Sequence, residues 1–95
     1  MSEEQQDQQV IYIGRKGTMS YCLVVVTIFN KGADECILKA RGRSISKAVD
    51  VAEISTRKFL AEQIKIDDIK IGSEEIETDT GVKTVSTIDI TLRRS

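Results

Sequence analysis

Twice in this chain, a short apolar run typical of a strand leads through a basic, glycine-containing turn into a longer helical pattern. The first such unit has its run at 10–13, its turn at 14–18 and its helix at 19–31. The second has its run at 35–40, a turn within 39–47 and its helix at 45–60. Strands joined through a helix in one sheet run parallel, so the pattern predicts a βαβ unit and then a second helix.

The last third of the chain predicts two antiparallel strands. Apolar residues alternate over 64–71, but their phase slips by one at Asp67-Asp68, which predicts a β-bulge. The closing strand alternates regularly, with Ile88, Ile90 and Leu92 facing inward. Between the two strands, residues 74–84 are mostly polar and contain a turn signal at 79–81, so we expect a hairpin arm that projects from the body.

Periodicity also predicts which helix faces are buried. Residues 10–13 are all apolar or aromatic, which favours burial on both faces of the first strand. The first helix should bury the stripe Met19, Cys22, Leu23, Val26 and Phe29 after an N-cap at Thr18, and end at Gly32. The second should bury Ile45, Ala48, Val49, Ala52, Phe59 and Leu60. Val51 and Ile54 then fall on the opposite side, either as scattered surface residues or as a contact with a second subunit or nucleic acid.

The two turns predict an anion site. The segment Lys39–Lys47 holds four cations and no acid, and the turn at 14–18 repeats its chemistry. Free backbone N–H groups and the positive end of the dipole lie where a helix begins, and they favour phosphate. In a parallel arrangement both turns lie at one edge of the sheet. We therefore expect a common phosphate-binding surface formed by Arg15, Lys16, Arg41, Arg43 and Lys47.

Composition limits the other possibilities. The net charge is −1, yet residues 14–58 carry nine cations and four acids, so a local positive field lies between acidic ends. No apolar run is long enough for a membrane span, and no secretory signal precedes the domain, so we expect a cytoplasmic protein with two free thiols. Residues 1–9 are expected to form a disordered acidic, Gln-rich tail, and residues 10–95 one domain.

The chain offers little for catalysis. It has no histidine, no cysteine placed beside a base and no carboxylate pair in an expected pocket. We therefore expect no enzyme activity, no metal, no cofactor and no small-molecule substrate. Its four aromatic residues fall mostly in core or strand positions, with Tyr21 near the first basic turn as the exception, so stacking on bases is not the expected mode.

The element order closely resembles the Alba family of archaeal nucleic-acid-binding proteins, as do the segments 13–21 (IGRKGTMSY), 39–50 (KARGRSISKAVD) and 51–54 (VAEI). The resemblance extends from about Val10 to Arg93. It implies an α/β (α+β) two-layer sandwich, in which two helices lie on one face of a mixed four-stranded sheet.

The resemblance also implies a homodimer that binds double-stranded DNA and RNA with little sequence preference, coats or compacts it as chromatin, and assembles further along DNA. It places Arg15 and Lys16 on the binding surface, with Lys16 as a candidate acetylation site, and matches Arg41 and Arg43 to the family's central arginines, with Lys47 one turn later. Phe59 matches an interface phenylalanine, and Ile54 and Leu60 are its expected neighbours at the dimer interface. Arg57 and, on the arm, Lys83 are further candidate contacts.

Three departures from the family pattern accompany these matches. Gly17 replaces a proline, residues 55–58 (STRK) replace the usual Val-Arg-Asn-Arg, and the arm is acidic, which predicts weaker affinity or a preference for RNA. A ribonucleoprotein subunit or RNA structure modulator is therefore the alternative function. A protein-interaction module that binds acidic partners is a third possibility, and it predicts no salt-dependent binding of nucleic acid.

Overall fold

The computed structural model describes residues 9–95, so the expected tail lies outside it except for Gln9, which begins the first strand. The elements are β1 (Gln9–Tyr12), α1 (Thr18–Asn30), β2 (Glu35–Arg41), α2 (Ile45–Ile54), β3 (Ile64–Thr78) and β4 (Gly81–Arg94). A 3₁₀ turn, η2 (Gly42–Ser44), leads into α2, and a π-helical turn, η3 (Ser55–Phe59), extends it. The predicted element order is therefore confirmed.

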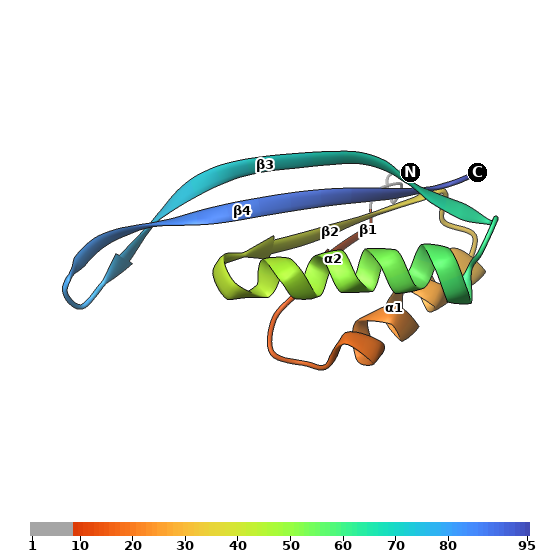
Figure 1. Ribbon diagram of the computed structural model, residues 1–95, viewed down its shortest axis with the longest axis horizontal. Helices are drawn as coiled ribbons and strands as arrows, with labels where there is room; N and C mark the ends of the chain where they lie inside the picture. Colours follow the sequence, from red (N-terminus) through yellow and green to blue (C-terminus); the bar gives the residue numbers. More distant parts are fainter. Residues whose placement is uncertain (1–8) are drawn as a thin grey trace, which may run out of the picture.

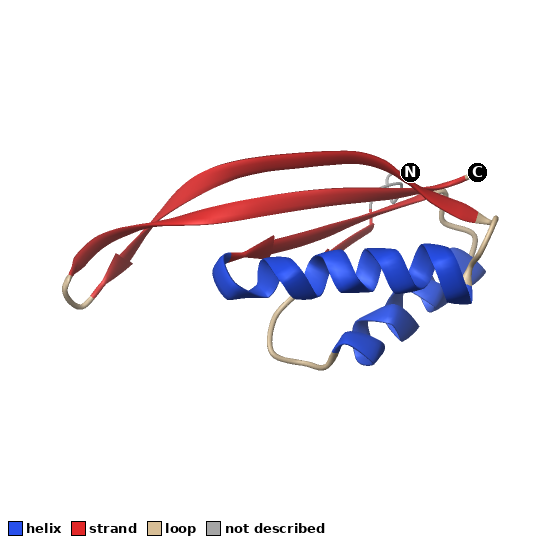
Figure 2. Ribbon diagram, viewed as in Figure 1, coloured by secondary structure: helices blue, strands red, loops and turns tan. Residues whose placement is uncertain are grey.

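The sheet has the strand order β1-β2-β4-β3. β1 and β2 are parallel, as the βαβ pattern predicts, whereas β4 is antiparallel to both β2 and β3. Both helices cover one face of this mixed sheet, and the other face is open (Figure 2). The two-layer α+β architecture expected from the resemblance is confirmed.

The core lies between the helices and alternate residues of the two central strands. Cys36, Leu38 and Ala40 of β2 face the helices, together with Ile88, Ile90 and Leu92 of β4, as the alternation predicts. Burial raises the pKa of the Cys36 thiol from 9.0 to about 12, because the apolar surroundings disfavour the thiolate. Cys36 therefore contributes to the core as a small neutral side chain.

The prediction that β1 is buried on both faces is wrong. Ile11 is buried beneath the helices, but Val10 is exposed and Tyr12 retains 74% of its accessible surface. The physical reason is that helices cover only one face of the sheet and β1 lies at its edge. A run of apolar residues is thus compatible with a strand that is half exposed.

The predicted stripe of α1 is confirmed at Cys22 and Phe29, and Val26 packs against the core, but the prediction is wrong at Met19 and Leu23. Tyr21, Cys22, Val25 and Phe29 are the buried residues of this helix, whereas Met19 and Leu23 are exposed. Residues 21–26 are all apolar or aromatic, so the sequence has almost no contrast from which a phase could be read. The end of the helix is as predicted, because Gly32 adopts a left-handed φ of 103°.

The face of α2 is also displaced from the prediction. Ala48, Val51, Ala52 and Ser55 form the buried stripe, and the predicted core residues Val49 and Phe59 are exposed. Because Ser55 is polar, its place in the buried stripe could not be recognised from the hydrophobic pattern. The N–H of Leu60 then bonds to the carbonyl of Ser55 at 2.9 Å, five residues back, so η3 rotates the chain and turns Phe59 off the core face while Leu60 stays buried.

The hairpin β3–β4 extends far beyond the rest of the molecule (Figure 1). The register shift between Ile66 and Asp68 is the predicted bulge. Partner strand β2 ends at Arg41, opposite Thr87, so the segments 73–78 and 81–86 pair only with each other. These two segments are the arm, and its two-residue turn at Asp79–Thr80 is the one the sequence predicts.

The buried serine gives a stability test. Within residues 9–95, the Ser55 hydroxyl is the one buried side-chain polar atom without a hydrogen-bond partner. Because an unsatisfied buried hydroxyl is unfavourable, Ser55→Ala should raise the free energy of unfolding by about 1 kcal/mol in a urea titration. Ser46→Ala, an exposed position on the same helix, is the matched control and should change it by no more than about 0.5 kcal/mol. A clear loss of stability in Ser55→Ala would contradict the assignment.

Candidate nucleic-acid interface

The loop between β1 and α1 is the first basic turn, and two hydrogen bonds hold it where it leaves β1. The N–H of Ile13 donates to the carbonyl of Lys39 at 2.8 Å, and the N–H of Gly14 donates to the Tyr21 hydroxyl at 2.8 Å. Tyr21 is thus a buried support for the loop, with its ring in the core rather than free to stack on a base. The side chains of Arg15 and Lys16, between these anchors and the helix, are exposed.

The start of α1 differs from the prediction in one detail. Thr18 is the first residue of the helix and Gly17 occupies the N-cap position, with no side-chain hydrogen bond to the helix end. Instead, the Gly17 carbonyl accepts from the N–H groups of Ser20 and Tyr21. A glycine therefore stands where a capping side chain was expected, and the backbone alone closes the turn.

The second basic turn connects β2 with α2. Gly42 has a φ of 58°, a left-handed conformation that a glycine adopts without strain, and it separates the exposed Arg41 from the exposed Arg43. The 3₁₀ turn then leads into the helix, so Arg43 lies before the first α-helical residue, Ile45. Arg43 is thus presented at a helix N-terminus, as the sequence predicts.

Lys47 joins the two basic turns. Its ammonium donates to the carbonyls of Gly14 and Lys16, each at 2.7 Å. These bonds place the β1–α1 loop directly against the first turn of α2, so the predicted convergence of the two turns is confirmed. Because the Lys47 ammonium is bonded to these two backbone carbonyls, it positions the β1–α1 loop and is not a free cation of the surface.

The cations nearest this junction differ in their partners. Arg15, Lys16 and Arg43 form no ion pair within the described part of the chain. Arg41, in contrast, bonds to the Glu74 carboxylate at 2.6 Å, and Lys39 pairs with Asp89 at 3.1 Å on the open face of the sheet. The loop edge is therefore the strongly positive part of this surface, and the adjoining sheet face is neutralised. We call Arg15, Lys16 and Arg43 the cationic edge.

A shallow groove adjoins the cationic edge on the open face of the sheet. It is lined by Tyr12, Ile13, Lys39, Ala40, Arg41, Glu74, Thr87 and Asp89. Both of its cations are paired with its acids, so the groove alternates charge along its length. An extended polyanion would meet the unpaired cations at the turns before it reached this groove.

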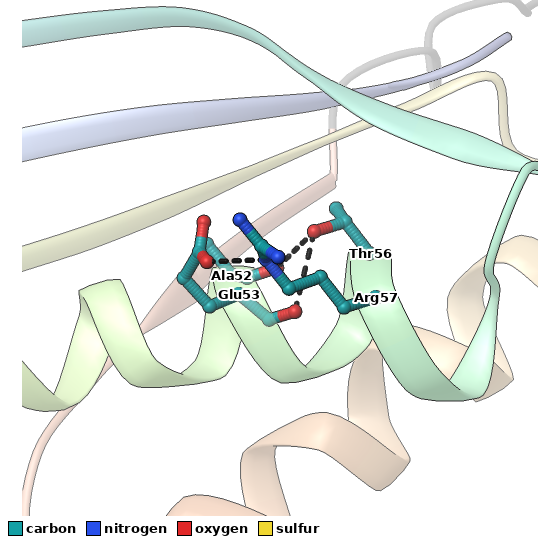
Figure 3. Close-up of polar contacts among 4 residues, drawn as sticks. All are labelled: Ala52, Glu53, Thr56 and Arg57. Carbon is teal, nitrogen blue, oxygen red and sulfur yellow. Dashed lines mark hydrogen bonds and ion pairs between the residues drawn. The ribbon is translucent and has the colours of Figure 1, made fainter.

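Arg57 lies away from the cationic edge. It belongs to η3, at the opposite end of the continuous helix that begins after Arg43. Its guanidinium turns back along the helix and bonds to the Glu53 carboxylate at 2.6 Å (Figure 3). The neighbouring Thr56 hydroxyl donates to the carbonyl of Ala52 at 2.8 Å, so both of these side chains are bonded back to the helix. Lys83 is exposed on the arm, opposite Ile76.

The residues expected at a dimer interface are not equally accessible. Leu60 belongs to the core of the chain and Ile54 packs partly against it, whereas Phe59 retains 43% of its surface. Two further apolar residues, Ile69 and Ile71 of β3, are 55% and 82% exposed. They pair with Ile90 and Ile88, so they lie on the helix side of the sheet at its uncovered edge. Their exposure could not be predicted from the sequence, because both residues belong to the alternating apolar pattern that is typical of a strand with one buried face.

No three His, Cys, Asp and Glu side chains in the described residues gather as ligands for a metal ion. None of the helices in residues 9–95 combines the length and apolar character needed to cross a membrane. The unpaired cations of the cationic edge can attract a polyanion.

The role of Lys47 can be tested without any ligand. Lys47→Met keeps the aliphatic stem but removes both bonds to the loop, so the free energy of unfolding should fall by about 1–2 kcal/mol. Amide hydrogen exchange over residues 14–18 should accelerate more than elsewhere, because the loop loses its attachment to α2. Lys58→Met, an exposed position later in the same helix, is the control. Equal exchange in both variants would show that the bridge does not hold the loop.

Comparison with known proteins agrees with this geometry. Residues 9–73 match the family model Alba. The chain is 48% identical over 88 residues to "DNA/RNA-binding protein Alba" of Thermoplasma acidophilum, covering 93% of this chain and 98% of that protein. It is 49% identical over 86 residues to the protein of the same name from Methanothrix thermoacetophila, covering 90% and 96%.

Solved structures show the same fold. Alba from Thermoplasma volcanium superposes with a TM-score of 0.86 at 48% identity, over 90% of this chain and all of that one. ALBA1 from Trypanosoma brucei superposes with a TM-score of 0.72 at 16% identity, over 98% of this chain and 73% of that one, and shares the fold. On the family match over residues 9–73 and the identity to full-length relatives, the chain belongs to the Alba family.

Proposed function

We propose that this protein binds duplex DNA and RNA through their phosphates, with little sequence preference, and coats or compacts nucleic acid as a chromosome-associated protein. The observation that carries the proposal is the cationic edge, where three unpaired cations from two turns converge beside helix N-termini. The names of the relatives, DNA/RNA-binding protein Alba, support the same function.

The mechanism is the neutralisation of phosphates. Arg15, Lys16 and Arg43 contact the backbone first, and Arg41 adds a contact when its carboxylate partner is displaced. Two chains together offer about six to eight contacts, so binding should weaken by about a thousandfold or more between 50 and 200 mM salt, because each contact releases condensed counterions. Tyr21 and Phe29 are buried and cannot stack on bases, which leaves Tyr12 in the adjoining groove as the aromatic side chain within reach of a base.

The active unit in this proposal is a homodimer, which could assemble further along DNA. Phe59 and Ile54, the accessible members of the expected interface, are joined by Ile69 and Ile71 on the uncovered edge of the helix layer. Large apolar side chains exposed together on one side of a small domain favour association with a second copy. Leu60 supports this interface from within the core.

Lys16 remains the proposed acetylation site. Its side chain is exposed on the loop, and its backbone carbonyl is already bonded to Lys47. Acetylation would remove one of three unpaired charges without breaking that bond, so it would weaken phosphate binding and leave the loop in place.

A role directed mainly at RNA is the second candidate, and the acidic arm favours it. The arm carries the acids Glu74, Glu75, Glu77 and Asp79 and the single cation Lys83, a balance that is unfavourable for insertion into a duplex groove lined by phosphates. Competition between a DNA duplex and a folded RNA at equal salt distinguishes the two candidates. Tighter binding of the RNA would make the RNA-directed role the primary one.

The binding surface is tested by removing the cationic edge. The triple variant Arg15→Ala, Lys16→Ala, Arg43→Ala should lower duplex affinity, measured by fluorescence anisotropy, by about tenfold or more at 50 mM salt. The slope of log K against log[salt] should become shallower by about three units per chain. The variant Lys31→Ala, Lys58→Ala, Lys65→Ala has the same charge change at exposed positions elsewhere. An equal loss in both variants would show that net charge, and not this surface, governs binding.

The dimer is tested at Ile71. Because its side chain is almost fully exposed in the single chain, Ile71→Lys should leave the fold intact but shift sedimentation toward the monomer and lower duplex affinity. Val82→Lys, an exposed apolar position on the arm, should leave the oligomeric state unchanged. A wild-type monomer at micromolar concentration would contradict the proposed dimer.

A further inference from the structure

Arg41 and Glu74 form an ion pair at the root of the arm. The Arg41 Nη1 atom lies 2.6 Å from Glu74 Oε1, and about half of each side chain is exposed. Arg41 is the last residue of β2, and its paired residue on β4 is Thr87. Glu74 is the second residue of β3 beyond the point where β2 ends, so it belongs to the unsupported part of the hairpin. The pair therefore connects the arm with the body.

The register explains why these two side chains meet. Arg41, Thr87 and Gly72 are laterally paired across three strands, so all three lie on the open face of the sheet. Glu74 follows Gly72 by two residues and returns to the same face. Glu75 points to the opposite face of the arm. One carboxylate of the acidic arm is thus directed at the binding surface, and its neighbour is not.

We propose that Glu74 is an internal competitor for phosphate at Arg41, and that it sets the affinity of this protein for nucleic acid. A carboxylate and a phosphate both bind a guanidinium most strongly through two parallel N–H···O bonds, and Glu74 already holds the Nη1 donor of Arg41. Full two-bond contact of a phosphate with both Nη donors of Arg41 therefore requires that Glu74 be released. This inference rests on the proposed phosphate-binding function and adds a residue that opposes it.

Two consequences follow from the exchange. The released carboxylate stays close to the bound backbone, where its charge retains a counterion and reduces the net release of salt. The arm also loses its ion pair to the body at the moment of binding, since Arg41 is the contact that Glu74 makes. Removal of the carboxylate should therefore tighten binding, increase its salt dependence and loosen the arm in the free protein.

The test compares Glu74→Gln with Glu75→Gln in the full chain, using a 20-base-pair duplex and fluorescence anisotropy at several salt concentrations. Both variants remove one negative charge from adjacent positions. Because exposed ion pairs are weak, Glu74→Gln should tighten binding by about two- to fivefold. In this variant the slope of log K against log[salt] should also become steeper by up to about one unit per chain. Glu75→Gln should change both by clearly less, and thermal denaturation should confirm that both variants fold.

A second background separates the ion pair from a general field effect. In Arg41→Ala, the further change Glu74→Gln should alter affinity no more than Glu75→Gln does, because no guanidinium remains to be freed. Equal tightening by Glu74→Gln and Glu75→Gln, or an undiminished effect of Glu74→Gln without Arg41, would overturn the proposal and leave the binding function standing. Absence of salt-dependent binding by the wild type and by every variant would instead reject the binding function itself.

Discussion

The bridge from Lys47 to two backbone carbonyls is the interaction on which the candidate surface depends. The parallel pairing of β1 and β2 brings the two strand-to-helix turns to one edge of the sheet, but pairing alone does not fix loops that contain glycines. One ammonium, bonded to Gly14 and Lys16, replaces the missing rigidity. It holds Lys16 beside the start of α2, and the exposed guanidinium of Arg43 projects from the same place.

Charge on this protein is distributed so that pairing, rather than composition, decides where a polyanion can bind. Net charge is close to zero, and the open sheet face and the end of α2 both neutralise their cations with acids. At the two turns, in contrast, Arg15, Lys16 and Arg43 form no ion pair in the described chain and gather in one place. A domain with a net charge close to zero can thus still present a focused positive field.

Much of the fold could be predicted from the sequence, because the signals were local. The βαβ unit, the bulge at Asp67, the regular alternation of β4 and the projecting arm all follow from short patterns. The helix faces could be predicted only in part, because residues 21–26 of α1 are all apolar or aromatic and α2 carries Ser55 at a core site before its π-helical turn. The partners of Lys47 and Arg41 lie more than 30 residues away, so only the three-dimensional register reveals them.

The π-helical turn has a geometric consequence for the outer surface. A regular helix advances by about 100° per residue, so one extra residue within a turn redirects every side chain that follows it. Here the redirection leaves the ring of Phe59 facing outward while the adjacent Leu60 closes the core. Because of this π-helical turn, one of two consecutive residues lies in the core and the other on the surface. If the same residues formed a regular α-helical turn, Phe59, four residues after the buried Ser55, would take the core position and Leu60 would turn outward.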